Sequence, residues 1–217
     1  ATNLCAGTYS VLISDNNGCT EISTATITEP SSLAVSVNGS NISCFNACDG
    51  SAIAVASGGT PNYSFVWNDP NVQTTATASN LCAGSYTVTV SDNNGCTETS
   101  SISLSEPSVL SNTLSTNNAS CYGSCDGTAS IVVSGGSPGY SYQWNDLAFQ
   151  TTPIASNLCA GSYSVTVTDT NGCVDITSVV ISEPPPIILT TSSVNSNCGN
   201  NDGQISVVAN VGNQGYT

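Results

Sequence analysis

One stretch occurs three times along the chain and constrains its fold more than any other feature. It reads Leu-Cys-Ala-Gly-(Ser/Thr)-Tyr, then an alternating Ser/Thr/Val run, then Asp-x-Asn-Gly-Cys. The copies occupy residues 4–19, 81–96 and 158–173, so they are 77 residues apart. An alternation of period two indicates a half-buried β-strand, and Asp-x-Asn-Gly indicates a turn after it. The sequence is therefore that of a tandem repeat protein.

Glu-Pro pairs mark the repeat boundaries, because proline lacks the donor that would continue a strand ladder and restrains the residue before it. They begin at Glu29, Glu106 and Glu183. We interpret the chain as a segment of a longer polypeptide. The expected division is a partial repeat of two last strands at 1–30, complete repeats at 31–107 and 108–184, and a partial repeat of first strands at 185–217.

Each complete repeat shows short alternating segments separated by turn signals, and no segment has a helical period. In the first complete repeat Tyr63, Phe65 and Trp67 alternate on a third strand, and Tyr86 opens the sixth. Residues 73–80 are polar and are expected to add one or two short edge strands. The pattern predicts an all-β fold of tandem immunoglobulin-like (PKD-like) antiparallel β-sandwiches, with about seven strands per 77-residue repeat.

Charge excludes several functions. The 217 residues contain no Lys, Arg or His, and the formal net charge is −14. Binding to nucleic acid or to anionic lipid headgroups needs basic side chains, so neither is expected, and no segment inserts into a membrane. The usual general bases and oxyanion stabilisers are missing too, so we do not expect an enzyme.

Eleven cysteines recur at repeating spacings. A zinc site without His would need four thiolates, and the Cys44-x-x-x-Cys48 spacing is loose for one. Disulfides in an oxidising, extracellular setting are the favoured interpretation.

The ordered motifs resemble a known family. They are Cys-(Phe/Tyr)-x-x-Cys-Asp-Gly, Ser-Gly-Gly, Tyr-x-(Phe/Tyr)-x-Trp, Ala-Gly-(Ser/Thr)-Tyr and Asp-x-Asn-Gly-Cys. Together they resemble the SprB-type repeats of large surface adhesins of gliding Bacteroidetes. The resemblance implies an extracellular, outer-membrane-attached filament, type 9 secretion and gliding motility, with the secretion and gliding machinery as partners. A PKD-like stalk is the alternative family.

Sandwich topology limits which cysteines can meet. The first strand carries Cys44 and Cys48 to one pole, and the sixth strand starts there with Cys82. Cys96 follows that strand at the opposite pole, about 20–25 Å away at about 3.3 Å per residue. A disulfide needs Cα atoms within about 7 Å, so Cys82–Cys96 and Cys44–Cys96 are disfavoured.

End-to-end stacking of repeats would bring Cys173 to Cys44. We therefore expect a bridge within each repeat, Cys48–Cys82 and Cys125–Cys159, and a bridge across a joint, Cys44–Cys173. Local Cys44–Cys48 pairing with free thiols elsewhere is the alternative. The remaining cysteines should have partners outside the sequence or in partial repeats: Cys5, Cys19, Cys96, Cys121 and Cys198.

The fourteen acidic residues fall at repeating positions. We expect that the fold requires no cofactor. We consider Ca²⁺ as a ligand of the repeat joints, because oxygen atoms that could bind it would gather there. Its expected ligands are Glu29, Asp92, Asn94, Glu106, Asp169 and Asn171. The alternative is that Asp-x-Asn-Gly only closes a turn through its own backbone.

These features predict a structural stalk segment of a filamentous adhesin. It would hold a distal tip away from the cell and transmit force, with neighbouring repeats of the same chain as its partners. The first alternative is that the repeats themselves bind polysaccharide or surfaces as adhesive modules. The second is an accessory domain of an enzyme encoded elsewhere in the gene.

Overall fold

The computed structural model describes residues 1–212, and these residues contain strands and turns but no helix. They form two compact units. The first comprises residues 1–42 and 46–106, and the second comprises residues 43–45 and the described residues from 107 onward. Residues 213–217, the end of the fourth expected repeat, lie outside the described residues.

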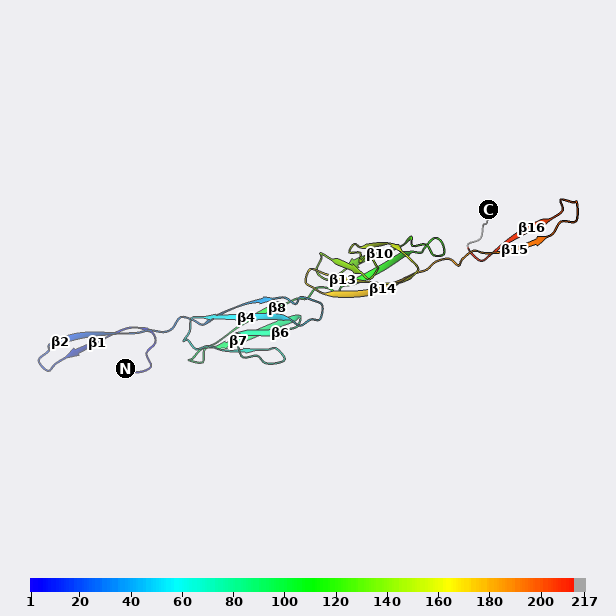
Figure 1. Cartoon of the computed structure of the whole chain (residues 1–217). Coiled ribbons are helices and arrows are strands. Elements are labelled where there is room, and N and C mark those ends of the chain that lie inside the picture. The colour runs from blue at the N-terminus through cyan, green and yellow to red at the C-terminus, as the bar shows by residue number, and fades with distance from the viewer. Residues whose placement is uncertain (213–217) are drawn as a thin grey trace. The chain divides into compact units, whose positions relative to one another are not determined.

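The first unit contains a hairpin and a sandwich. The hairpin pairs β1 (Gly7–Ser14) with β2 (Thr20–Ile27). One sheet of the sandwich has the order β3-β4-β6 and the other β5-β7-β8. Figure 1 labels β4, β6, β7 and β8 of this sandwich. The strands are β3 (Ala34–Ser40), β4 (Gly50–Ser57), β5 (Ser64–Trp67), β6 (Thr77–Leu81), β7 (Gly84–Ser91) and β8 (Thr97–Leu104).

The second unit repeats this plan. One sheet has the order β12-β10-β9 and the other β11-β13-β14, and a hairpin of β15 and β16 follows. The strands are β9 (Ser111–Asn117), β10 (Gly127–Ser134), β11 (Ser141–Trp144), β12 (Ile154–Leu158), β13 (Gly161–Thr168), β14 (Val174–Ile181), β15 (Ile188–Val194) and β16 (Gln204–Asn210). All strand pairs are antiparallel. The predicted fold class, tandem immunoglobulin-like sandwiches, is confirmed.

Alternating side chains from both sheets fill each core. In the first sandwich Val88 and Val90 of β7 are fully buried, as is Trp67 of β5. The Trp67 indole N–H donates to the Thr75 carbonyl at 3.0 Å, which satisfies the polar end of a buried ring. Trp144 occupies the same place in the second sandwich. The tryptophans are therefore core residues.

The strand count differs from the expectation. Residues 31–107 hold six strands, because the segment before β6 folds around a buried carboxylate. Asp69 accepts hydrogen bonds from the backbone N–H groups of Asn71 and Gln73 and from the Gln73 side-chain amide. These bonds close a loop where an additional edge strand was expected.

Shortening a core side chain tests this packing. Val88→Ala should lower the free energy of unfolding of the first sandwich by about 2 kcal/mol, since about 0.8 kcal/mol is lost per buried CH₂ and a cavity remains. The variant is made in a Trp144→Phe background, so that Trp67 fluorescence reports this sandwich alone during urea unfolding. Thr89→Ala, on the opposite face of the strand, is the control. Equal destabilisation by both changes would contradict the assigned faces.

Candidate functional site

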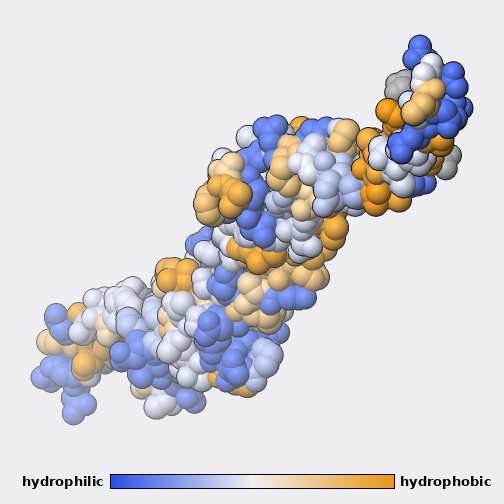
Figure 2. All heavy atoms as spheres, turned by 45° about the vertical axis from the view of Figure 1, so that its right-hand side comes forward, coloured by the Kyte–Doolittle hydropathy of each residue, from blue (hydrophilic) through white to orange (hydrophobic). Residues whose placement is uncertain are grey.

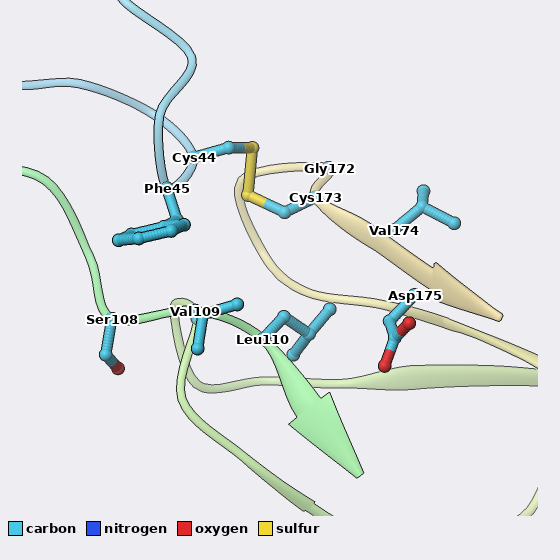
Figure 3. Close-up of a pocket in the computed structure, with 10 residues that line it drawn as sticks. Cys44, Phe45, Ser108, Val109, Leu110, Gly172, Cys173, Val174 and Asp175 are labelled. Carbon is cyan, nitrogen blue, oxygen red and sulfur yellow. A yellow bond between two sulfur atoms is a disulfide. The ribbon is translucent and has the colours of Figure 1, made fainter. Parts of the chain in front are cut away.

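The cysteines of the second unit define the site. Cys44 lies on the segment 43–45 and is bonded to Cys173. The two Cα atoms are 5.7 Å apart, and the two cysteines are 129 positions apart in the sequence. Figure 3 shows the bond between the segment of Cys44 and the turn that precedes β14. Two further bridges join Cys48 to Cys82 and Cys125 to Cys159. These are the pairs derived from sandwich topology, and Cys44 is not bonded to Cys48.

The turn that carries Cys173 is built around one carboxylate. Asp169 is buried, and its Oδ1 accepts hydrogen bonds from the N–H groups of Asn171 and Cys173, both at 2.9 Å. Its Oδ2 accepts one from the N–H of Ser137 at 2.7 Å. Burial raises the pKa of Asp169, but the backbone N–H groups, that of Ser137 first, outweigh it and leave the pKa below the ordinary value. The ionised carboxylate therefore fixes the position of the Cys173 backbone.

The Ser-Gly-Gly motif allows this close approach. Gly136 has φ +60°, and a Cβ there would lie 2.6 Å from Asp169 Oδ2. Gly59 has φ +59° and holds the same relation to Asp92 in the first sandwich. Glycine is required at both positions, because a side chain would displace the carboxylate.

A second contact ties the segment of Cys44 to the same turn. The side-chain amide of Asn171 donates to the Ser43 carbonyl at 2.9 Å and to the Ser137 hydroxyl at 2.8 Å. Apolar groups border the bridge as well: Phe45, Val109 and Leu110 line a pocket beside Cys44 and Cys173 (Figure 3). The disulfide thus sits in a site with polar and apolar contacts of its own.

Each bridge within a sandwich lies beside a tyrosine whose hydroxyl binds the backbone of the bridged cysteine. The Tyr86 hydroxyl donates to the Cys82 carbonyl at 3.0 Å, and the Tyr163 hydroxyl donates to the Cys159 carbonyl at 3.1 Å. Tyr9 makes the same bond to the Cys5 carbonyl at 2.9 Å. The tyrosine therefore positions the cysteine that precedes its strand in all three copies.

Five cysteines have exposed, unbonded thiols among the described residues: Cys5, Cys19, Cys96, Cys121 and Cys198. They are the five for which the sequence analysis expects partners outside the sequence or in partial repeats. The turn before Cys96 is the counterpart of the turn before Cys173. In it Asp92 Oδ1 accepts from the N–H groups of Asn94 and Cys96, at 2.9 and 2.8 Å. The turn before Cys96 therefore has the same geometry as the turn before Cys173, although Cys96 is not bonded to a partner.

The residues expected to bind calcium have other partners or are exposed. The carboxylates of Asp92 and Asp169 accept from backbone N–H groups, and Glu106 accepts from the Asn46 N–H at 2.7 Å. Asn94 donates to the Thr60 hydroxyl at 2.8 Å, and Glu29 is exposed. Residues 1–212 hold no group of three or more His, Cys, Asp or Glu side chains that could bind a metal ion. Calcium binding stays a prediction.

Some of the site was not found from the sequence. Asn171 was considered only as a calcium ligand or a turn residue, and its bond to Ser43 spans 128 residues of sequence. The apolar contacts of Phe45 and Leu110 were also missed. A signal for them exists, because positions 45 and 122 are both aromatic and positions 110 and 187 are both large and aliphatic.

Comparison with known families identifies the repeat. The family model for the SprB repeat matches residues 36–72 and residues 113–149. Two segments of the chain therefore match the SprB repeat, and the resemblance inferred from the motifs is confirmed. The SprB repeat is a non-enzymatic kind of repeat. The three disulfides together with SprB repeats indicate an extracellular protein.

Several solved structures are similar at low sequence identity. One of them is a structure described as the structural basis for Dscam isoform specificity. It matches with 13% identity and a TM-score of 0.33, and the match covers 77% of this chain and 51% of that chain. This chain thus spans about half the length of the Dscam chain. An amphioxus IgVJ-C2 molecule matches with 13% identity over 71% of this chain and 98% of its own, with a TM-score of 0.29.

A tetra-tandem repeat from the extending region of a large adhesion protein matches with 14% identity over 96% of this chain and 71% of its own, with a TM-score of 0.25. A search of the curated proteins finds no match. Within residues 1–212 no helix is long and apolar enough to cross a membrane.

Removing the carboxylate that anchors the turn should weaken the bridge. We expect Asp169→Ala to lower the reductant concentration that opens Cys44–Cys173 roughly tenfold, because backbone donors at Cys173 lose a charged acceptor. The measurement is alkylation of Cys173 across a dithiothreitol series, followed by mass spectrometry. Asp92→Ala is the matched control, since it loosens the equivalent turn before the unbonded Cys96. An equal effect of both variants would show that Asp169 does not act on the bridge.

The loop between Cys121 and Cys125 offers a pH test. Hydrogen bonds from the Ser120 side chain and N–H, and then from the Ser124 hydroxyl, lower the pKa of Asp126 from 3.8 to about 2. A lowered pKa means that the ionised form stabilises the folded loop. This contribution is complete above about pH 4 and is lost as the pH falls towards 2.

The carboxyl ¹³C resonance of Asp126 should therefore titrate near pH 2, and Ser120→Ala should move the midpoint up. Ser130→Ala, on β10, is the control and should leave it unchanged. A wild-type midpoint near 4 would contradict the hydrogen bonds to this carboxylate.

Proposed function

We propose that this chain is a stalk segment of a filamentous surface adhesin. It carries tension between a distal tip and the cell during surface adhesion and gliding. The observation that supports this most directly is the Cys44–Cys173 bond, which joins cysteines 129 residues apart. The SprB repeats support an adhesin as the parent protein.

The bond changes the covalent path of a pulling force. Tension that arrives at Cys44 crosses the disulfide to Cys173, so the chain between them, a sequence separation of 129, carries none of it. Strands β4 to β13 lie within this loop, as do the Cys48–Cys82 and Cys125–Cys159 bridges. The strands that form most of both cores are therefore bypassed while the bond is closed.

The bond also stabilises the fold without load. A cross-link that closes a loop of this length removes conformational entropy from the unfolded chain, by roughly 5 kcal/mol in the chain-entropy model. The effect suits a protein outside the cell, where reductants are scarce and no chaperone refolds it.

Surface chemistry fits the same role. A net charge of −14 would keep neighbouring filaments apart, and the absence of Lys and Arg removes the cleavage sites of trypsin-like proteases. We propose outer-membrane attachment, type 9 secretion and partners in the gliding machinery on the basis of the SprB repeats. We also propose that the chain is divided into four repeat segments, at 1–30, 31–107, 108–184 and 185–217. The partners of each repeat are its neighbours in the chain.

A second candidate function is adhesion by the repeats themselves. Two large apolar side chains, Leu147 and Phe149, are exposed on the loop between β11 and β12. An exposed aromatic ring can stack on a sugar. Its counterpart in the first sandwich is Val72, so at this loop position only the second of the two complete repeats carries a ring. Binding to a polysaccharide array that Phe149→Ser abolishes would favour this function over the stalk.

Pulling single chains by their two termini tests the stalk. The oxidised chain should reach a final extension about 450 Å shorter than the reduced chain, because 129 residues of about 3.5 Å each stay behind the bond. Cys44→Ser should lengthen the oxidised chain. Equal extension of oxidised and reduced chains would overturn the proposed force path.

Cys48→Ser is the matched control. It opens a bridge that lies wholly inside the bypassed loop, so the final extension of the oxidised chain should not change. Lengthening by Cys48→Ser would mean that tension enters the loop despite the Cys44–Cys173 bond.

A further inference from the structure

Two turns of the chain have the same backbone structure around an Asn-Gly step. The steps are Asn94-Gly95, before Cys96, and Asn171-Gly172, before Cys173. In both turns the Asn N–H donates to the side chain of the buried aspartate at 2.9 Å. The Gly N–H donates to the carbonyl of the same aspartate, at 3.0 Å for Gly95 and 3.1 Å for Gly172. The two glycines also share a left-handed backbone, with φ +82° and +85°. The two turns are therefore a matched pair.

The side chains of the two asparagines are held differently. The Asn94 amide donates to the Thr60 hydroxyl at 2.8 Å. The Asn171 amide makes the matching bond to the Ser137 hydroxyl at 2.8 Å and a second bond to the Ser43 carbonyl at 2.9 Å. An asparagine amide has two N–H donors, so Asn171 uses both. Ser43 directly precedes Cys44, which places the second bond beside the Cys44–Cys173 bridge.

An asparagine followed by glycine can react with its own backbone. The glycine nitrogen loses its proton to hydroxide and attacks the asparagine Cγ, and no glycine side chain obstructs the approach. The Cγ–Nδ2 bond breaks, ammonia leaves after taking a proton from water, and a five-membered succinimide remains. Water then opens the ring to aspartate or isoaspartate. In total one water is consumed and one ammonia is released, and nothing is oxidised.

The contacts of Asn171 act on the first step of this reaction. The side chain must rotate until Cγ meets the Gly172 nitrogen, so the bonds to Ser43 and Ser137 must break first. Water is not limiting, because Asn171 and Gly172 are exposed. Figure 2 shows hydrophilic side chains spread over the visible surface, and Figure 3 shows Gly172 beside Cys173. The bond to Ser43 is the contact that the disulfide controls.

We propose that Asn171 is a deamidation site that the Cys44–Cys173 bond protects. While the bond is closed, the Ser43 carbonyl holds the amide and the reaction is slow. When the bond opens, Ser43 is released together with Cys44, and Asn171 keeps only the contact with Ser137. It then reacts as fast as Asn94. The inference goes beyond the proposed function and does not rest on it, since it needs the bridge but no tension.

The product acts back on the bridge. A carboxylate at position 171 has no N–H to donate, so it would set one acceptor against another at the Ser43 carbonyl. An isoaspartate also lengthens the backbone of the turn that positions Cys173. Deamidation therefore disfavours closure of the bridge, and an opening of the bridge leaves a permanent covalent mark.

The test follows both asparagines in one sample of the full chain. The oxidised protein is incubated at mildly alkaline pH in ¹⁸O-labelled water, digested with chymotrypsin and analysed by mass spectrometry. The label marks deamidation that occurs during the incubation. Asn171 should react roughly fivefold more slowly than Asn94, the effect of one additional hydrogen bond. Equal rates in the oxidised protein would overturn the proposal.

Opening the bridge should remove the difference. In Cys44→Ser/Cys173→Ser the rate at Asn171 should rise to that of Asn94, and the rate at Asn94 should not change. Cys125→Ser/Cys159→Ser removes a different bridge of the same unit and is the control, in which Asn171 should stay slow. Unchanged Trp67 and Trp144 fluorescence shows that both sandwiches stay folded. A rate at Asn171 that does not respond to opening of the Cys44–Cys173 bond would overturn the proposal.

Asn171→Asp tests the effect of the product on the bridge. It should lower the reductant concentration that opens Cys44–Cys173 roughly fivefold, because an acceptor replaces the donor to Ser43. Asn94→Asp makes the same change in the matched turn and should leave this concentration unchanged. Equal effects of the two variants, or no effect of Asn171→Asp, would overturn the proposed action of deamidation on the bridge.

Discussion

A chain with fourteen carboxylates and no basic side chain must find other partners for its buried acids. It uses backbone N–H groups. Asp92 and Asp169 close the turns that precede a cysteine, and Asp69 and Asp146 close the loops after the core tryptophans. The described residues contain no buried side-chain oxygen or nitrogen without a hydrogen-bond partner. Each ionised group therefore fixes a loop rather than forming a salt bridge, and the loops so fixed position the cysteines.

Covalent bonding depends on that positioning. The thiol of Cys173 can meet Cys44 because Asp169 holds the backbone of its turn and Asn171 holds the carbonyl of Ser43. Since the hydrogen bonds exist in the same form at Asp92, the turn does not need the disulfide in order to form. The carboxylate therefore fixes the turn, the turn positions the cysteine, and the positioned cysteine forms the bridge. A protein built this way can form the same turn before a cysteine in each repeat without a special sequence for each one.

Much of the fold follows from the sequence because its signals are local. Alternation fixed which side chains of β7 face inward, and the Glu-Pro pairs marked the ends of repeats. The features that the sequence does not predict also have a physical explanation. Residues 73–80 predict one or two edge strands and form only one, because a polar Thr-rich run does not reveal that the Asp69 carboxylate will accept three hydrogen bonds from the residues before that strand. The bond from Asn171 to Ser43 joins positions 128 residues apart, and a turn motif carries no information about a distant partner.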